Sequence, residues 1–477
     1  MNSLIQLKQT TSVFIVAFGL ACSGFLPRTQ AVVPAPDGGY PGGNTAEGQS
    51  ALLRLSNGGY NTAVGFLSLA SDMTNSFNTA IGAGALLANT ADQNTAAGAG
   101  ALLSNTTGSG NTANGAFALF LSASGVNNTA IGVGALENNT QSYNSGIGAS
   151  ALSSNTTGFQ NTAVGESALL SNIDADGNTA LGVSALRLNT HGVHNTATGT
   201  FALFNNITGV ENTAVFFDAL FNNTNSYNTG TGFQALFSNT DGTYNTANGY
   251  QALASNTTGI ANNAVGSTAL VFNTRGRYNT AIGDAAGYNA TTGDHNVYVG
   301  AGMYGVAGES NACYIASVYG QSIDPVTATT VAVDANNKLG TMPSARRFKK
   351  DIKPMDDASN ALLALKPVIF HYKSDKNNTP CFGLIAEEVV KVNPALATLG
   401  KDGKPYSVRY DQINVMLLNE FLKEHKAFVA EQGKVQEQGA TIVGLQQQIE
   451  ALTAGFEKMR AQLELNKKAP QTVLNAQ

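Results

Sequence analysis

A fixed pattern of polar and apolar positions runs through most of the chain. Its consensus is Asn-Thr-Ala-x-Gly-x-x-Ala-Leu-x-x-Asn-Thr-Thr-Gly-x-x, and it recurs in steps of 17 residues, three of which shorten to 16. Self-similarity at a fixed period indicates a repeat array, in which each unit packs on its neighbours. The asparagines that open the sixteen units are Asn44, Asn61, Asn78, Asn94, Asn111, Asn128, Asn144, Asn161, Asn178, Asn195, Asn212, Asn228, Asn245, Asn262, Asn279 and Asn296.

The period and the residue types predict a mostly β fold for this array. A unit of 17 residues is too short for a pair of helices, and two glycines per unit would break a long helix. One unit therefore fits one coil of a β-solenoid or β-roll, whose coils stack ~4.8 Å apart. We expect a β-solenoid shaft over residues 44–300, with glycines at corners that need a positive φ.

Each coil is expected to contribute to several ladders along the shaft. The residue before the first glycine is often Val, Ile or Leu, as at Val64, Ile81 and Leu181, so we predict that it points inward. The Ala-Leu pair, for example Ala85-Leu86, supplies a second apolar ladder. Stacked asparagine side chains can form hydrogen bonds along the axis, as in other stacked-strand assemblies.

The pattern changes after residue 300. Residues 301–343 are predicted to form a neck, with a strand at residues 326–334 and a hairpin turn at residues 334–340. Residues 431–468 carry apolar residues every seven positions, which predicts a coiled coil. Its two heptad positions hold Val435, Ile442, Ile449, Phe456 and Leu463, and Gln438, Leu445, Leu452, Met459 and Asn466.

The N-terminal residues 1–31 indicate an export signal. Lys8 precedes an apolar run at residues 13–22, which is too short to span a membrane, and a small-residue cleavage site ends at Ala31. Cys22 partly matches a lipoprotein box, and we favour plain secretion over a lipid anchor at this cysteine. Once the signal is removed, no segment is predicted to span a membrane.

Two further segments lie outside the predicted folds. Residues 32–43 form a Pro/Gly-rich leader, and residues 469–477 are predicted to be a disordered tail. Cleavage at Ala31 would leave Cys313 and Cys381, and two isolated cysteines do not make a disulfide framework.

Charge is scarce and unevenly placed. Only 12% of the 477 residues are charged, and the net charge is −5. From Arg346 onward come 19 of the 26 lysines and arginines. A negative net charge without a basic patch interleaved with aromatic residues argues against nucleic acid as a partner.

The acidic residues of the array fall mostly at variable positions of the unit. Charges that keep a rod soluble explain them, whereas a glycosidase site would need two carboxylates that converge on a sugar bond. His191 and His194 are predicted to lie in a solvated turn rather than at a metal, and calcium-binding Gly-Gly-x-Gly-x-Asp repeats are missing. We therefore predict no cofactor and no metal. The acidic residues are Asp72, Asp92, Glu137, Glu166, Asp174, Asp176, Glu211, Asp218, Asp241 and Asp284.

An aromatic cluster interrupts the consensus within the array. Phe216-Phe217 replaces the glycine corner of one unit. Such side chains can bind sugar rings, pack in the core, or form a face buried between three chains, and we favour a buried position. The phenylalanines nearby in sequence are Phe201, Phe204, Phe221 and Phe233.

A candidate catalytic pair lies where the chain becomes basic. Ser344 comes five residues before Lys349, a spacing compatible with a lysine that activates a serine. This spacing is common by chance, and a basic run is usually a solvated face. The pair gains meaning from the segments that follow it.

The order and spacing of four segments resemble a known domain. They are Ser344-Ala-Arg-Arg-Phe-Lys-Lys-Asp-Ile352, Ala361-Leu-Leu-Ala-Leu-Lys-Pro-Val-Ile-Phe-His-Tyr372, Gly383-Leu-Ile-Ala-Glu-Glu-Val389 with Asn393-Pro-Ala-Leu396, and Tyr410-Asp-Gln-Ile413. Together they resemble the C-terminal intramolecular chaperone auto-processing domain of endosialidase-type phage tail spikes and fibres. The resemblance implies a small α+β domain, which we place at residues 344–430, that trimerises, helps a β-rich fibre to fold and then cuts the chain.

The resemblance also implies which residues cut. Ser344 and Lys349 match the catalytic serine and lysine of the family, and Pro343–Ser344 is the bond that would break once, in cis. The family usually has Asp after the serine, where this chain has Ala345, and Pro343 restricts the backbone before the bond. We therefore expect self-cleavage to be slower than in family members or absent. No turnover enzyme is evident.

These patterns predict a secreted or surface-displayed, fibre-like or adhesin-like structural protein that forms a homotrimer. Isoleucine opposite leucine in the heptads slightly favours two strands, whereas the resemblance implies three, and we follow the resemblance. The partner of the shaft would be a cell-surface or glycan ligand. The alternative is a tail-spike-like protein that binds or depolymerises a glycan on its shaft.

Overall fold

The computed structural model describes residues 40–334, 336–400 and 402–467. The chain divides into two units, Met1–Ile323 and Asp324–Gln477. The export signal at residues 1–31, with Cys22, and the tail at residues 469–477 lie outside the described residues, as does most of the leader. The neck predicted at residues 301–343 is divided between the two units.

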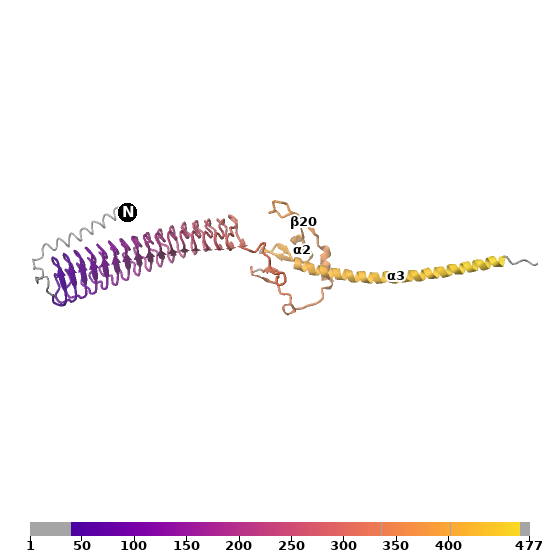
Figure 1. Ribbon diagram of the computed structural model, residues 1–477, viewed down its shortest axis with the longest axis horizontal. Coiled ribbons are helices and arrows are strands. Elements are labelled where there is room, and N and C mark those ends of the chain that lie inside the picture. Colours follow the sequence, from indigo (N-terminus) through magenta and orange to yellow (C-terminus); the bar gives the residue numbers. More distant parts are fainter. Residues whose placement is uncertain (1–39, 335, 401, 468–477) are drawn as a thin grey trace, which may run out of the picture. The chain divides into compact units, whose positions relative to one another are not determined.

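The first unit is a β-solenoid, as the repeat predicts (Figure 1). Each coil contributes one strand of three residues, and consecutive strands pair in parallel into one sheet of 17 strands. The ladder extends past residue 300 to β17. The strands are β1 (Thr45–Glu47), β2 (Thr62–Val64), β3 (Thr79–Ile81), β4 (Thr95–Ala97), β5 (Thr112–Asn114), β6 (Thr129–Ile131), β7 (Ser145–Ile147), β8 (Thr162–Val164), β9 (Thr179–Leu181), β10 (Thr196–Thr198), β11 (Thr213–Val215), β12 (Thr229–Thr231), β13 (Thr246–Asn248), β14 (Asn263–Val265), β15 (Thr280–Ile282), β16 (Val297–Val299) and β17 (Cys313–Ile315).

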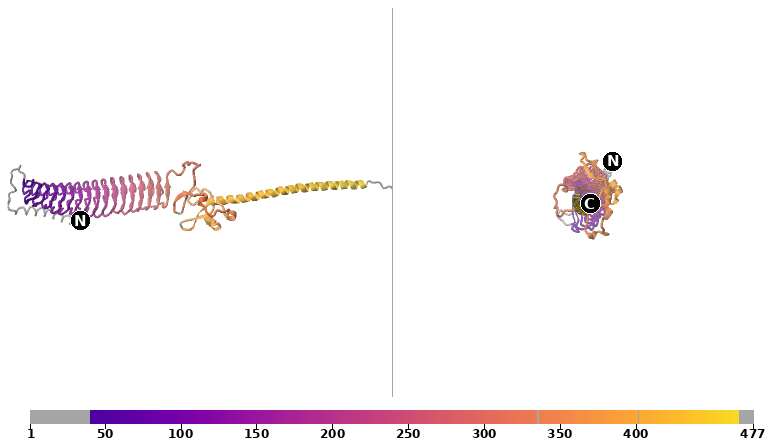
Figure 2. Two further views of the ribbon diagram at one scale, coloured as in Figure 1. Left: turned by 90° about the horizontal axis from the view of Figure 1, so that it is seen from below. Right: turned by 90° about the vertical axis from the view of Figure 1, so that its right-hand side faces the viewer.

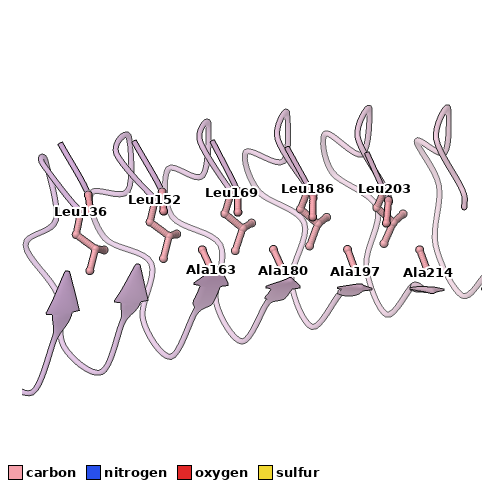
Figure 3. Packing of buried hydrophobic residues seen from close by; sticks show 14 of the residues in the cluster. Leu136, Leu152, Ala163, Leu169, Ala180, Leu186, Ala197, Leu203 and Ala214 are labelled. Carbon is pink, nitrogen blue, oxygen red and sulfur yellow. The ribbon is translucent and has the colours of Figure 1, made fainter. Parts of the chain in front are cut away.

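The core of the shaft is a narrow ladder of alanine and leucine. The middle residue of a strand, such as Ala163 or Ala180, is fully buried, and so is the Ala-Leu pair, for example Ala185-Leu186. In Figure 3 the leucine side chains of successive coils point toward the strand alanines. The predicted Ala-Leu ladder is therefore confirmed.

The residue before the corner glycine points outward, so its predicted inward position was wrong. The side chains of Ile81 and Ile131 are 47% and 40% exposed, because successive strand residues face opposite sides and the middle alanine faces the interior. Two coils have glycine in place of this alanine, at Gly146 and Gly230. A methyl group on Gly146 would lie only 3.2 Å from Cγ of Leu136. The interior therefore has room for a methyl group but not for a branched side chain.

The buried leucines adopt a backbone conformation that the sequence pattern does not reveal. Leu136 and Leu186 have φ angles of 52° and 51°, in the left-handed region where a bulky residue is unusual. This conformation costs about 1–2 kcal/mol, whereas complete burial of a leucine contributes about 1.5–3 kcal/mol, so burial outweighs the cost. Glycine takes the sharper corner as predicted, because a Cβ atom on Gly182 (φ 141°) would lie 2.6 Å from the carbonyl of Gly199.

A first asparagine ladder joins the coils, as the stacked asparagines predict. The backbone N–H of each opening asparagine donates to the side-chain oxygen of the preceding one, for example from Asn178 to Asn161 at 2.9 Å. This ladder is continuous from Asn44 to Asn296. It satisfies buried backbone donors that would otherwise be costly to leave unpaired.

A second asparagine ladder runs through the other asparagine of the unit. There the Nδ2 atom donates to the Oδ1 atom of the preceding coil, at distances from 2.6 to 3.4 Å. The Oδ1 atoms of Asn105 and Asn273 are buried without a partner among the described residues. The cause is that the next coil holds Ser122 or Ala290, which cannot supply the amide. A buried unsatisfied polar group costs about 1–3 kcal/mol.

The end of the shaft exchanges its large and small core residues. Tyr298 replaces the strand alanine and is fully buried, while Gly287 replaces the leucine. A Cβ atom on Gly287 would lie 2.8 Å from the ring of Tyr298, so the two substitutions compensate each other in volume. Tyr314 stacks on Tyr298 with ring centroids 5.6 Å apart. Burial, followed by the charges of Glu309 and Tyr314, raises the pKa of Tyr298 to about 12.

The second unit begins with a hairpin and ends in a long helix. A hairpin lies where the sequence predicts one, although its first strand covers only Val331–Val333 of the predicted residues 326–334. The elements are β18 (Val331–Val333) paired with β19 (Leu339–Thr341), the 3-10 helices η1 (Arg346–Phe348) and η2 (Asp356–Ala364), β20 (Val368–Phe370) paired with β21 (Cys381–Gly383), α2 (Ala386–Val392), η3 (Pro394–Leu396), β22 (Ala397–Leu399) paired with β23 (Pro405–Val408), and α3 (Tyr410–Lys467). The small domain that follows the shaft is thus present.

The terminal helix starts earlier than the coiled coil predicted from its heptads. α3 runs without interruption from Tyr410, well before residue 431 (Figure 2). None of the helices in the described ranges is long and apolar enough to cross a membrane. Cys313 and Cys381 are both free thiols.

Candidate functional site

Ser344 and Lys349 come together across one 3-10 turn. Within η1 the N–H of Phe348 donates to the carbonyl of Ala345 at 2.9 Å, and the N–H of Lys349 donates to that of Arg346 at 3.0 Å. This turn aligns the two side chains, and the Nζ atom of Lys349 donates to the Oγ atom of Ser344 at 3.1 Å. The spacing seen in the sequence is therefore a direct contact in space.

The surroundings of the pair are basic and open. Ser344 and Lys349 are both exposed, and Arg346, Arg347 and Lys350 add positive charge beside them. A lysine acts as a base only in its neutral form, and in the chain as described the pair lies open to solvent.

Three of the four segments that carry the family resemblance meet in one small hydrophobic core. Val389 of α2, Leu396 of η3 and Ile413 of α3 are buried together, with partly buried residues of η2 packed against them. The N–H of Leu384 donates to the hydroxyl of Tyr410 at 2.9 Å, which joins the end of β21 to the start of α3. The second, third and fourth segments are thus parts of a single packing unit, whereas residues 344–352 are exposed and contribute none of its residues.

A polar cluster that the sequence analysis missed joins η2 to α3. Ser359 is fully buried, and its hydroxyl donates to Glu420. Asn419 donates to the Ser359 oxygen at 2.6 Å, and Lys423 donates to Glu420 at 2.8 Å. Hydrogen bonds from Lys423 and then from Ser359 lower the pKa of Glu420. Because the Ser359 hydroxyl is enclosed, the cluster fixes packing rather than performing chemistry.

Only one pair of this cluster could be recognised from the sequence. Glu420 and Lys423 are three residues apart, a spacing at which side chains on a helix interact. Their buried partner Ser359 lies 61 residues earlier than Glu420. Local pattern analysis cannot connect residues so far apart in the chain.

The aromatic residues of the shaft form columns outside its core. Neighbouring rings of these columns lie face to face, with centroids 5.2 to 5.6 Å apart and interplanar angles from 6° to 15°. Each ring therefore covers its neighbour's face and leaves its edge exposed, whereas a sugar ring packs on an aromatic face. Of the alternatives considered for these residues, packing in the core of the shaft is therefore wrong. Burial between three chains stays a prediction. The columns are Phe204-Phe221-Phe237 and Phe217-Phe233-Tyr250.

The polar residues considered for chemistry on the shaft have structural surroundings. Asp72 is fully buried at an asparagine position of the second ladder, and it accepts hydrogen bonds from Asn75 and Asn78. Burial raises its pKa. His191 contacts Asp174 on the exposed surface. Within the described ranges, no group of three or more His, Cys, Asp or Glu side chains gathers in a way that could hold a metal ion.

The heptad positions of α3 form an exposed apolar stripe. Ile442, Ile449 and Phe456 are 56%, 61% and 67% exposed. Long helices in proteins gain most of their stability by packing such a face. An open groove of about 480 Å³ near the first turns of α3 is lined by further apolar side chains, among them Ile369 and Leu417. The second unit therefore presents several apolar surfaces for a partner.

Comparison with known proteins identifies the segment that contains the Ser344–Lys349 pair. No curated protein and no solved structure matches the chain. The family model described as the chaperone of endosialidase matches residues 344–398, a range that begins at Ser344 and includes η1, η2, α2 and the β20–β21 pair. A β-solenoid shaft followed in sequence by a segment similar to the chaperone of endosialidase supports a tail-fibre-like or tail-spike-like protein.

Proposed function

We propose that this chain is a secreted or surface-displayed fibre protein that assembles as a homotrimer, with its second unit as the trimerising chaperone of its shaft. The observation that carries the proposal is the exposed apolar stripe of α3, the helix that follows the segment matched by the family model. Three such helices wound around one another would bury the stripe. Export rests on the signal pattern of residues 1–31.

A trimerising chaperone would align three shafts in the correct register. Its coils are so alike that a slip of one coil between neighbouring shafts would change few contacts. A compact domain and a helical bundle at one end fix the register before the coils stack. The shaft then grows coil by coil from an aligned start.

Self-cleavage follows from the same assembly. The hydroxyl oxygen of Ser344 attacks the carbonyl carbon of Pro343, and Lys349 accepts the hydroxyl proton. The C–N bond breaks as its nitrogen takes that proton, which leaves Pro343 bound to the Ser344 oxygen as an ester. Water then hydrolyses the ester and frees a shaft that ends at Pro343. Neighbouring copies in the trimer would provide the burial that makes Lys349 neutral.

Intact mass of purified full-length protein tests the cut. We expect slow conversion to two fragments that meet at Pro343 and Ser344, and no conversion in Ser344→Ala or Lys349→Ala. The informative gain-of-function variant is Ala345→Asp, which restores the residue usual in the family. It should speed cleavage roughly tenfold, equivalent to about 1.4 kcal/mol of barrier.

The possible results separate three mechanisms. A trimer that stays whole in both the wild type and Ala345→Asp would make the second unit a permanent trimerisation cap. The same fragment from Ser344→Ala would mean that an outside protease cuts an exposed linker. In either case the cleavage mechanism is wrong, while the fibre assignment stands on its own.

A further inference from the structure

The outward side of the 17-strand sheet has an unusual composition. This sheet face consists of the first and third residues of each strand, such as Thr179 and Leu181 in β9. From β2 to β17 it contains no charged residue, and Glu47 in β1 is the one exception. Many charges of the shaft lie instead in turns that precede an opening asparagine, and others, such as Glu166 and Asp284, follow a corner glycine. Charged residues of these turns include Asp92, Asp174, Asp241, Arg275, Arg277 and Asp294.

The fold itself does not require apolar residues on the sheet face. Asn114, Thr198, Thr231 and Asn248 occupy the third strand position in strands of the same length and pairing as the others. Most remaining coils nevertheless hold Val, Ile or Leu there, with exposures such as 40% at Leu181. A long row of exposed apolar side chains along one sheet marks an interaction surface.

We propose that three shafts pack with their sheet faces toward a common axis, so that the same residue of each copy meets in one layer. This inference rests on the proposed trimer and specifies which surface of the shaft lies inside it. The occupant is another copy of this chain, because the row of apolar side chains runs the whole length of the sheet and only a second shaft repeats at the same strand spacing. From β2 to β17, three identical uncharged faces also meet without like-charge repulsion.

The polar interruptions of the sheet face suit this arrangement. A single asparagine layer in an apolar interface specifies register, because a slip leaves its amides unpaired. A slip of one coil would place Asn114 against Ile131 or Ala97, and Asn248 against Val265 or Thr231. These layers therefore distinguish the correct register among coils that are otherwise alike.

Cysteine cross-linking of the full-length protein tests the proposal. Cys313 is the first residue of β17 and is exposed on the sheet face, so mild oxidation of the wild type should join neighbouring copies there. A reporter in the middle of the shaft is Leu181→Cys, combined with Cys22→Ser, Cys313→Ser and Cys381→Ser. Its matched control is Asp241→Cys in the same background, which places the thiol in a charged turn.

The expected result is a disulfide-linked dimer plus one free chain per trimer for Leu181→Cys, in more than half of the trimers, and little cross-linking for Asp241→Cys. Disulfides form only when the two Cα atoms come within about 7 Å. Adding Asn114→Ile and Asn248→Ile should lower the Leu181→Cys yield severalfold, since the register is then less specified; an unchanged yield would refute the role of the polar layers.

Two results would overturn the packing itself. A trimer in sedimentation that gives no cross-link at Leu181→Cys has shafts that do not meet by this face, and the proposed fibre function would survive that outcome. Equal cross-linking of Leu181→Cys and Asp241→Cys would mean that the shafts meet without a preferred face. A monomer in sedimentation would overturn both this inference and the proposed trimer.

Discussion

Residues that face each other in the core of the shaft compensate each other in volume, and the pair at the end of the shaft is the clearest case. Gly287 and Tyr298 fill one space that a leucine and an alanine fill in the preceding coils. Each residue is therefore acceptable only beside the other. The hydroxyl of Tyr298 is buried without a partner among the residues described, which shows that the ring is retained for its volume and for its stacking on Tyr314.

A double-mutant cycle measures this coupling. Tyr298→Ala should lower stability by about 3–5 kcal/mol, as for other large-to-small core changes, and Gly287→Leu alone should clash with the ring. The double variant restores the consensus pair, so it should be more stable than the sum of the single effects by about 1–3 kcal/mol. Thermal unfolding of the full chain compares the four proteins. Additive losses would mean that the two residues do not share one space.

A second residue-scale prediction concerns Asp72 and pH. Burial raises the pKa of Asp72 above its ordinary 3.8 in the folded chain, so the folded state binds the proton more tightly than the unfolded state. The stability from this group is greatest below pH 3.8 and declines as the pH rises through the folded pKa. Asp72→Asn should therefore gain in melting temperature over the wild type, and the gain should grow from pH 3.5 to pH 7.

The matched control for this experiment is Ser122→Asn. It also restores an asparagine to the second ladder, where it would donate to the unpartnered Oδ1 atom of Asn105, but it changes no charge. Its stabilisation, about 1 kcal/mol for one added hydrogen bond, should be the same at both pH values. A gain from Asp72→Asn that does not depend on pH would assign the effect to the ladder alone.

At the scale of elements, the sequence predicted the coils but not the way each coil turns. The period, the glycine corners, the Ala-Leu ladder and the asparagine ladder follow from residue chemistry that every unit repeats. The inward position of residues such as Ile81 was wrong, because one strand residue per coil faces inward and the opposing leucine leaves room there for alanine only. The left-handed conformation of the leucines was missed for a related reason. Its conformational free-energy cost is offset by burial in the folded shaft, which the intrinsic propensity of leucine does not reflect.

The second unit was predictable where its contacts are local and not where they are distant. Ser344 and Lys349 are five residues apart in one local turn, so spacing and resemblance could suggest a pair whose atoms lie 3.1 Å apart in the structure. The bonds of Ser359 to α3 join residues about sixty positions apart, which no periodic pattern encodes. The helix start at Tyr410 was also missed, because the heptads begin only after the turns that pack on η2.

At the scale of the whole molecule, two exposed apolar surfaces suit the same kind of partner, another copy of the chain. The stripe of α3 and the sheet face of the shaft each repeat along an element and are each largely free of charge. A small ligand would cover only a short part of either surface. In the proposed trimer, further copies of the chain would cover both surfaces, because they repeat with the same length and spacing.

The helix stripe can be tested apart from the shaft. Ile449→Asp with Leu452→Asp places two carboxylates per chain in the proposed helical interface, where desolvation and mutual repulsion disfavour association. We expect the full-length protein to sediment as three chains and this variant to dissociate at least 100-fold more readily, equivalent to about 2.7 kcal/mol. The control is Gln447→Asp, which adds a carboxylate beside the stripe rather than in it and should leave the trimer intact. If the variant with both carboxylates stays trimeric, α3 is not the trimerising element, and the small domain or the sheet face must hold the copies together.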